Sequence, residues 1–278
     1  TERLIAELNA LPGKPDWFTE TFCVRARYLQ PGNGARVDAI RERIARLSLE
    51  PELEAIALTS LMEAADRVDS TTGVQMAYLK RWSARSHQPL RLRAPELLPG
   101  AGSASCLDAL EAARRFEADV AYLDPPYNQH SYLGNYHVWE SLVRWDKPAV
   151  YGVAMKRADV RERCSRFNRR GEIEAALGAV VETVRARHLL VSFSDEGYLG
   201  REKLEAMLGG RGAVEVAAVP YPRYVGARIG IYNPKGEKVG TPGRLTNREL
   251  LFLVRDRAGR VRGRRGQPRR DPPDLLDR

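Results

Sequence analysis

Four consecutive residues, Asp124-Pro125-Pro126-Tyr127, carry groups that can hold a planar amine. They follow the apolar run at 118–123, which predicts a buried strand that ends at Asp124. The Asp124 carboxylate and the Pro125 carbonyl can each accept a hydrogen bond from the amine. The prolines restrict the backbone and hold both acceptors in place, while Tyr127 adds a flat ring on which a base can stack.

The amino group of a nucleobase is the substrate that suits this set of acceptors. The exocyclic amine of adenine is a poor nucleophile because its lone pair is delocalised into the ring. Acceptors that bind its hydrogens localise that lone pair on nitrogen, and the remaining task is to position an electrophile against it. The same chemistry suits an adenine in RNA or the amide of a glutamine side chain, so both stay open as alternatives.

A second Asp-Pro-Pro triplet in the chain shows how much the surroundings matter. Asp271-Pro272-Pro273-Asp274 has no aromatic residue at its fourth position and follows no apolar run. We interpret it as a turn in a polar tail. The tetrapeptide at 124–127 has both the tyrosine and the preceding strand, so a chemical role is favoured there over a rigid strand-to-loop turn.

The segment 124–146, DPPYNQHSYLGNYHVWESLVRWD, resembles the adenine-specific DNA methyltransferases of the Dam-type class, in which DPPY is the catalytic motif. The resemblance continues through SFSDEGY at 192–198 and RYVGARIG at 223–230, and it covers roughly residues 30–255. It implies a Rossmann-like methyltransferase sheet with a helical insertion, S-adenosylmethionine as methyl donor and double-stranded DNA as partner. It also implies a cytoplasmic enzyme, stand-alone or in a restriction-modification system, that methylates the N6 amino group of adenine.

The resemblance, together with position along the chain, suggests further site residues. In the family, Asp124, Pro125, Pro126 and Tyr127 would surround the target base. Asp108 matches by position an acidic residue at the end of the preceding strand, which in the family contacts the adenine end of the cofactor. Residues next to the motif or in a basic loop are expected to bind the substrate: Asn128, Ser131, Tyr132, Arg223 and Arg228.

The family's glycine-rich cofactor loop, F-x-G-x-G after a first strand, has no clear counterpart upstream of Asp124. Gly32-Asn33-Gly34 follows no apolar strand, Gly100-Ala101-Gly102 lies too close to Asp124, and the glycines at 226–230 fall in a long loop. Because the chain begins at Thr1, we expect an N-terminal portion with the first strand, the loop and a ribose-binding acid to be absent. These residues should then bind S-adenosylmethionine poorly, and a nucleic-acid-binding remnant without activity is the alternative function.

From residue 118 onward the apolar pattern alternates between strands and helices, which predicts an α/β fold with a mostly parallel sheet. The predicted strands cover 118–123, 189–193, 214–219 and 250–254. The predicted helices cover 109–115, 136–144, 172–187 and 201–208. The last two strands, joined by a loop at 220–247, are expected to form an antiparallel hairpin. Residues 37–82 are predicted to be mostly helical, after a turn at 31–34.

Three regions follow from these patterns: a mostly helical region at 1–100, an α/β catalytic region at 101–255 and a basic tail at 256–278. The helical region is either a target-recognition insertion or a scaffold.

The net charge is +9, and residues 255–270 hold eight arginines and one aspartate. We expect the tail to be disordered, either as an electrostatic contact to a polyanion or as a solvated end. A second basic stretch offers phosphate contacts or plain surface charge: Lys156, Arg157, Arg161, Arg163, Arg169 and Arg170.

The remaining composition excludes several classes of protein. The sequence contains no run of about 18 apolar residues, so no membrane span is predicted. The three cysteines are far apart, which predicts neither a disulfide framework nor a metal site and favours an intracellular compartment. His130 and His137 flank the motif without partners at ligand spacing, so no metal is expected.

Overall fold

The computed structural model describes residues 1–71, 73–75, 82–223, 231–232, 238–240 and 245–256. The chain divides into two compact units, and each is described by itself. Unit 1 comprises Thr1–Ala104, Asn128–Arg169 and Arg223–Leu245. Unit 2 comprises Ser105–Tyr127, Arg170–Pro222 and Thr246–Arg278. The basic tail at 257–278 lies outside the described residues, and the three regions expected from the sequence stay a prediction.

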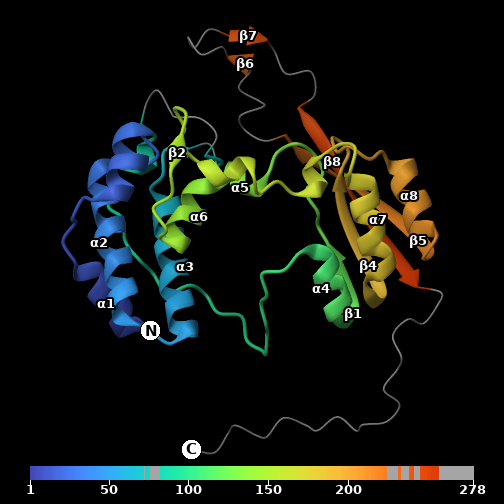
Figure 1. The fold of residues 1–278 in the computed structure, drawn as a ribbon, viewed down its shortest axis with the longest axis horizontal. Helices are drawn as coiled ribbons and strands as arrows, with labels where there is room; N and C mark the ends of the chain where they lie inside the picture. The colour runs from blue at the N-terminus through green and yellow to red at the C-terminus, as the bar shows by residue number, and fades with distance from the viewer. Residues whose placement is uncertain (72, 76–81, 224–230, 233–237, 241–244, 257–278) are drawn as a thin grey trace, which may run out of the picture. The chain divides into compact units, whose positions relative to one another are not determined.

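Unit 1 is built mainly of helices (Figure 1). They are α1 (Glu2–Ala10), a π-helical segment (Thr19–Arg25), α2 (Pro31–Leu47), α3 (Pro51–Arg67), α5 (Tyr132–Asn135) and α6 (His137–Arg144). Short 3-10 helices cover Ala84–His87, Ala158–Arg161 and Arg166–Asn168. Two small sheets of two strands each complete the unit: β2 (Val150–Tyr151) pairs with β3 (Lys156–Arg157), and β6 (Ile231–Tyr232) pairs with β7 (Lys238–Gly240). The prediction that residues 37–82 are mostly helical is confirmed for 37–47 and 51–67, whereas residues 76–81 lie outside the described residues.

The predicted turn at 31–34 is wrong, because these residues form the first turn of α2. Pro31 takes the first helical position, where its missing N–H costs no hydrogen bond. Gly34 lies where α2 packs on the π-helical segment, and a Cβ at this position would overlap the Sγ of Cys23. This glycine therefore serves close packing and not a turn.

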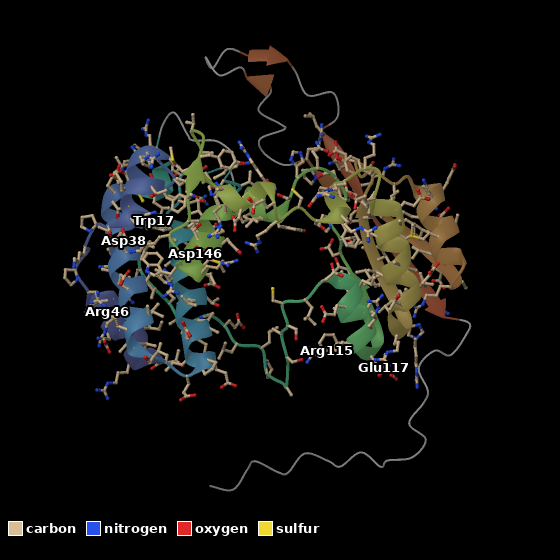
Figure 2. All side chains as sticks on the ribbon, in the orientation of Figure 1. Trp17, Asp38, Arg46, Arg115, Glu117 and Asp146 are labelled. Carbon is tan, nitrogen blue, oxygen red and sulfur yellow. The ribbon has the colours of Figure 1, made fainter. Side chains whose placement is uncertain are left out.

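The π-helical segment is held to α2 by one buried carboxylate. Asp38 of α2, labelled in Figure 2, accepts hydrogen bonds from the backbone N–H groups of Asp16, Phe18 and Thr19 at 2.9, 3.0 and 2.8 Å. The Thr19 hydroxyl donates a fourth, at 2.5 Å. Capping of N-terminal N–H groups by a carboxylate is a favourable arrangement. The core of unit 1 then closes over side chains such as Phe18, Phe22 and Ile40, none of which is exposed.

Unit 2 contains a four-stranded sheet with the order β1-β4-β8-β5. Its strands are β1 (Glu117–Leu123), β4 (Arg185–Ser194), β5 (Gly212–Pro222) and β8 (Thr246–Asp256), and its helices are α4 (Ala109–Arg115), α7 (Ile173–Thr183) and α8 (Arg201–Gly209) (Figure 1). All four predicted strands and the helices 109–115 and 201–208 are confirmed. The helix predicted at 172–187 ends at Thr183, because Val184 is already extended and β4 begins at Arg185.

The sheet is mixed, and the expectation of a mostly parallel sheet needs correction. In the described part of the chain, β1 pairs with β4 in parallel, while β8 runs antiparallel to both β4 and β5. The predicted hairpin of the last two strands is confirmed, and its second strand lies between β4 and β5. The α/β class is also confirmed.

The burial predicted for 118–123 is wrong. β1 is an edge strand of the described sheet, and Val120 and Tyr122 are 56% and 57% exposed. β4 is the buried strand, with Leu189, Val191 and Phe193 fully covered. In the residues that the structure describes, none of the helices has the length and apolar composition that crossing a lipid bilayer requires.

Candidate active site

The tetrapeptide 124–127 follows β1 directly, as the sequence predicts. β1 and β4 run parallel with Leu123 opposite Val191, so the carboxyl ends of the two strands lie side by side. Ligands of open α/β sheets bind beyond these ends. The Asp124 side chain is exposed, whereas Pro125, Pro126 and Tyr127 are partly buried. The carboxylate is thus presented to solvent, next to three residues that are partly buried.

Tyr127 is packed and hydrogen-bonded by the end of β4. Its ring lies 6.0 Å from the ring of Phe193, centroid to centroid, at an interplanar angle of 60°. Its backbone carbonyl accepts a hydrogen bond of 2.8 Å from the N–H of Tyr198. A tilted aromatic pair at this separation is an attractive arrangement. One face of the site is therefore set by β4 and by the turn that follows it.

The turn after β4 is anchored on β8. The Asp195 N–H donates to the Arg248 carbonyl at 3.0 Å, and the Arg248 N–H donates to the Asp195 carboxylate at 3.1 Å. The Asn247 amide donates to the Glu196 carboxylate at 2.7 Å. In the sequence alone, residues 192–198 stand out only through the family resemblance. The sequence does contain a signal for this turn: polar residues follow the apolar strand at 189–193, just as Asp124 follows the apolar strand at 118–123. If the two strands run parallel, their following residues lie at the same edge of the sheet.

Three predicted substrate-binding residues belong to unit 1, where they stabilise a loop and a short helix. The side-chain oxygen of Asn128 accepts a hydrogen bond from the His130 N–H at 2.9 Å. The backbone carbonyl of Asn128 accepts one from the side-chain amide of Asn168 at 2.7 Å. Ser131 caps α5 by accepting the Gly134 N–H at 3.0 Å. Tyr132 stacks on Tyr136, with centroids 6.2 Å apart, and is 56% exposed. Of the three, Tyr132 presents the largest accessible surface to a ligand.

The other predicted binding residues are placed as follows. Arg223 is half-buried, and its N–H donates to the Leu245 carbonyl at 2.9 Å. Arg228 lies outside the described residues. The expectation that Asp108 ends a strand is wrong, because residues 101–108 are irregular and Asp108 is the N-cap of α4. Its carboxylate accepts the Leu110 N–H at 2.9 Å. The cofactor contact of Asp108 stays a prediction.

One member of the basic stretch cannot contact a phosphate in this structure. Arg157 is 1% exposed, and its guanidinium bonds the carboxylates of Asp146 (labelled in Figure 2) and Asp159 at 2.7 to 3.0 Å. These hydrogen bonds, with that to Asp146 the largest cause, raise the pKa of Arg157 above its ordinary value. Arg163 is more accessible and pairs with Glu140 at 2.9 Å. Neither alternative given for the basic stretch, a phosphate contact or plain surface charge, therefore holds for Arg157.

His137 is part of the buried interior of unit 1. It is fully covered, and its Nε2 lies 3.0 Å from the Gln75 carbonyl, which fits a neutral ring with the proton on Nε2. Burial lowers the pKa of His137 to about 4. Among the described residues, no group of three or more His, Cys, Asp or Glu side chains has the arrangement of a metal site.

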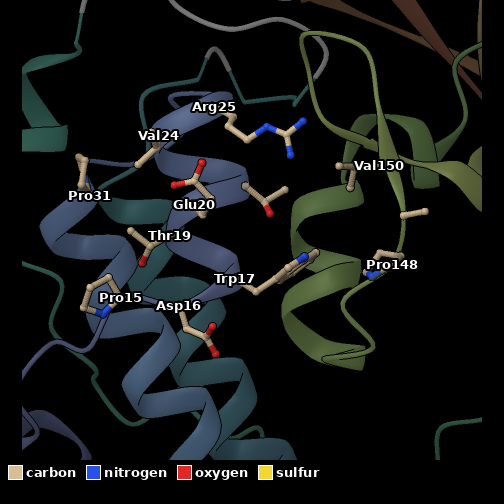
Figure 3. Close-up of a pocket in the computed structure, with 12 residues that line it drawn as sticks. Pro15, Asp16, Trp17, Thr19, Glu20, Val24, Arg25, Pro31, Pro148 and Val150 are labelled. Atoms are coloured by element: carbon tan, nitrogen blue, oxygen red, sulfur yellow. The ribbon is translucent and has the colours of Figure 1, made fainter.

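An open hollow of about 1030 Å³ lies in unit 1, between the π-helical segment and the strand at Val150 (Figure 3). Asp16, Glu20 and Arg25 line it together with Trp17. The Asp16 carboxylate is paired with Lys147 at 3.0 Å, and this hydrogen bond lowers the pKa of Asp16. None of the described residues predicted to bind the base or the cofactor lines this hollow.

The glycine pairs considered for a cofactor loop do not fit that role in the described chain. Gly32 and Gly34 are helical, and Gly100 and Gly102 lie in an irregular segment that follows no strand. The pair at 226–230 lies outside the described residues. None of these three pairs therefore forms, in the described part of the chain, the glycine-rich turn after a first strand that the family's cofactor loop has.

Comparison with known proteins identifies relatives of this chain. The sequence model of the family described as "D12 class N6 adenine-specific DNA methyltransferase" matches residues 1–207. The chain is 34% identical over 206 residues to Type II methyltransferase M.FokI of Planomicrobium okeanokoites, covering 71% of this chain and 32% of that protein. It is 30% identical over 209 residues to Modification methylase StsI of Streptococcus sanguinis, covering 72% and 32%.

A third relative is covered more fully. Type II methyltransferase M.NlaIII of Neisseria lactamica is 23% identical over 231 residues, which are 80% of this chain and 68% of that protein. The chain thus spans about a third of the length of the first two relatives and about two thirds of the third. No solved structure matches the chain significantly.

Proposed function

Because this chain belongs to the D12 class of N6 adenine-specific DNA methyltransferases, we propose that its protein transfers a methyl group to the N6 amino group of adenine in DNA. The observation that carries the proposal is the exposed Asp124 carboxylate at the carboxyl end of β1, directly followed by two prolines and a supported tyrosine. The names of the relatives, a type II methyltransferase and a modification methylase, support a role in restriction-modification.

The chemistry of the motif follows from its acceptors. A flipped-out adenine would present its amine to the Asp124 carboxylate and the Pro125 carbonyl. Each of these oxygens would accept one hydrogen bond from the amine. Both bonds draw the nitrogen lone pair out of conjugation with the ring and leave it free for attack. Stacking of the base on Tyr127 would keep the amine in that position, a contribution of about 1–3 kcal/mol per base. Asp124 and Pro125 thus activate the base, and Tyr127 orients it.

The methyl donor implied by the family is S-adenosylmethionine, which supplies an electrophilic methyl group on a sulfonium when it is bound. Neither the glycines at 32 and 34 nor those at 100 and 102 form its usual loop, so we assign no donor contact beyond the predicted one at Asp108. Activation and orientation of the amine are the parts of the reaction that the described residues support.

Double-stranded DNA is the proposed partner, and two exposed residues support it. Tyr132 offers an accessible ring five residues after the motif in the chain, and Arg163 lies in the basic stretch with its side chain 45% exposed. Phosphate contacts by such arginines would position the duplex, while sequence is read elsewhere. Asn128 and Ser131 would act indirectly, because their side chains already shape the loop that carries Tyr132.

Transfer of a labelled methyl group tests the proposal. The natural polypeptide that contains these residues is incubated with tritiated S-adenosylmethionine and either unmethylated DNA or RNA of similar length. We expect label in DNA, because the D12 family acts there, and at least tenfold less label in RNA. Preferential labelling of RNA would identify the substrate as RNA, and no labelling of either nucleic acid would support the inactive binding protein.

A further inference from the structure

Gly197 lies at the point where the turn after β4 meets the ring of Phe193. A Cβ at Gly197 would overlap Cε1 of Phe193 and would lie 3.0 Å from its Cδ1 and 3.1 Å from its Cζ. The backbone of Gly197 is not in the left-handed region, so the requirement is for space and not for an unusual φ. Any side chain at this position would have to move the Phe193 ring.

The Phe193 ring has little freedom to move without disturbing Tyr127. It is fully buried, and its ring packs against that of Tyr127 with centroids 6.0 Å apart. The residue after Gly197 holds the same tyrosine from its backbone side, because the Tyr198 N–H donates to the Tyr127 carbonyl at 2.8 Å. One short turn thus determines both the ring packing and the backbone position of Tyr127.

Several hydrogen bonds and one cation–π contact hold the turn. The Gly197 N–H donates to the Ser194 carbonyl at 2.9 Å, and the Glu196 N–H donates to the Ser194 hydroxyl at 3.3 Å. The Arg170 guanidinium lies 5.0 Å from the centre of the Tyr198 ring, within the range of a cation–π contact. Asp195 is bonded in both directions to Arg248 of β8. The turn cannot relax easily when Phe193 is displaced.

We propose that Gly197 is a positioning residue for the base-binding tyrosine: its missing side chain admits the Phe193 ring, and Phe193 with the Tyr198 amide fixes where Tyr127 presents its own ring. The inference rests on the proposed function only for the claim that Tyr127 stacks on the target base. The contact chain from Gly197 through Phe193 to Tyr127 is a property of unit 2 alone. A glycine that makes no contact with substrate would then control the rate of transfer.

The first test reads the position of Tyr127 directly. Protein labelled with 3-fluorotyrosine is studied by fluorine NMR, and the Tyr127 signal is identified by its loss in Tyr127→Phe. We expect Gly197→Ala to shift or split this signal. Gly200→Ala is the matched control, because it lies in the same connection and a Cβ there meets nothing within 4 Å. An unchanged Tyr127 signal in Gly197→Ala would overturn the proposal.

A double-mutant cycle separates this mechanism from general damage to the fold. Phe193→Leu removes the ring atoms that the new Cβ would strike, so Gly197→Ala should add little further change to the Tyr127 signal in that background. If Gly197→Ala alone fails to fold, the double variant should regain folding and Phe193→Leu alone should still shift the Tyr127 signal. Equal effects of Gly197→Ala in both backgrounds would contradict the route through Phe193.

Methyl transfer provides the functional readout. We expect Gly197→Ala to lower kcat/KM for DNA at least tenfold, mainly through kcat, while Gly200→Ala keeps the wild-type rate. If the wild-type protein transfers no methyl group, the proposed function fails, and the NMR experiments still decide whether Gly197 positions Tyr127. A shifted Tyr127 signal with an unchanged transfer rate would remove the functional half of the inference.

Discussion

At the scale of single residues, the structure separates side chains that face solvent from those that support them. Asp124 is exposed at the end of β1, whereas Tyr127 is partly buried and contacts Phe193. The sequence predicts the position of Asp124 because an apolar run and two prolines are local signals. It does not predict that Arg157 is buried, because its partners Asp146 and Asp159 come together only through the fold of unit 1.

His137 gives a prediction about pH. Its pKa falls from the ordinary 6.5 to about 4 because burial disfavours the charged ring. The unfolded chain therefore binds more protons than the folded one between these two values, so stability is complete above pH 6.5 and is lost as the pH falls toward 4. We expect this residue to account for a loss of about 3 kcal/mol across that window.

Urea unfolding at pH values from 7.5 to 4.5 measures this dependence. His137→Gln keeps a donor for the Gln75 carbonyl but does not titrate, so its free energy of unfolding should fall less steeply with acid. His130→Gln, in an exposed loop, is the control and should follow the wild-type curve. A His137→Gln curve as steep as the wild-type curve would show that another group causes the loss.

At the scale of elements, local pattern predicts which segments are helices and strands but not where each lies in the sheet. The apolar residues at 118–123 predict β1 correctly. Their burial is predicted wrongly, because edge position depends on pairing with β4 and not on the strand's own sequence. The start of α2 is missed for a different reason: Pro31 and Gly32 favour turns in general, yet proline also suits the first position of a helix.

Gly34 provides a prediction about helix packing. Gly34→Ala should destabilise the protein by about 1–3 kcal/mol, because its Cβ would overlap Cys23 in a closely packed core. Gly32→Ala, two residues earlier in the same helix, meets nothing within 4 Å and should be neutral or up to about 1 kcal/mol more stable. Thermal unfolding of the two variants measures the difference.

A second substitution checks the cause. Cys23→Ala removes the sulfur that the new Cβ would strike, so adding Gly34→Ala in this background should cost less than it does in the wild type. Independent, additive effects of the two changes would mean that the cost of Gly34→Ala arises elsewhere, for example in the first turn of α2.

At the scale of the whole molecule, two units carry different parts of the proposed reaction. Unit 2 carries Asp124 and the turn that fixes Tyr127, and unit 1 carries Tyr132 and the accessible part of the basic stretch. The resemblance stated from the motif is confirmed by a family match over residues 1–207. Neither the motif nor the fold identifies the donor-binding loop, and weak binding of S-adenosylmethionine by these 278 residues stays a prediction for calorimetry.

Nucleoside analysis of cellular DNA measures whether Asp124 activates an adenine amine in DNA. The natural polypeptide that contains these residues is expressed in a bacterial host without adenine methylation, as wild type, as Asp124→Ala and as Asp119→Ala. Asp119 lies on the same strand with its side chain 82% exposed, so its substitution controls for loss of a surface carboxylate.

Mass spectrometry of the digested DNA should find N6-methyldeoxyadenosine with the wild type and with Asp119→Ala, and a decrease of at least 100-fold with Asp124→Ala at equal amounts of folded protein. Wild-type protein that leaves the DNA unmethylated, or Asp124→Ala protein that methylates it as fully as the wild type, would contradict the account.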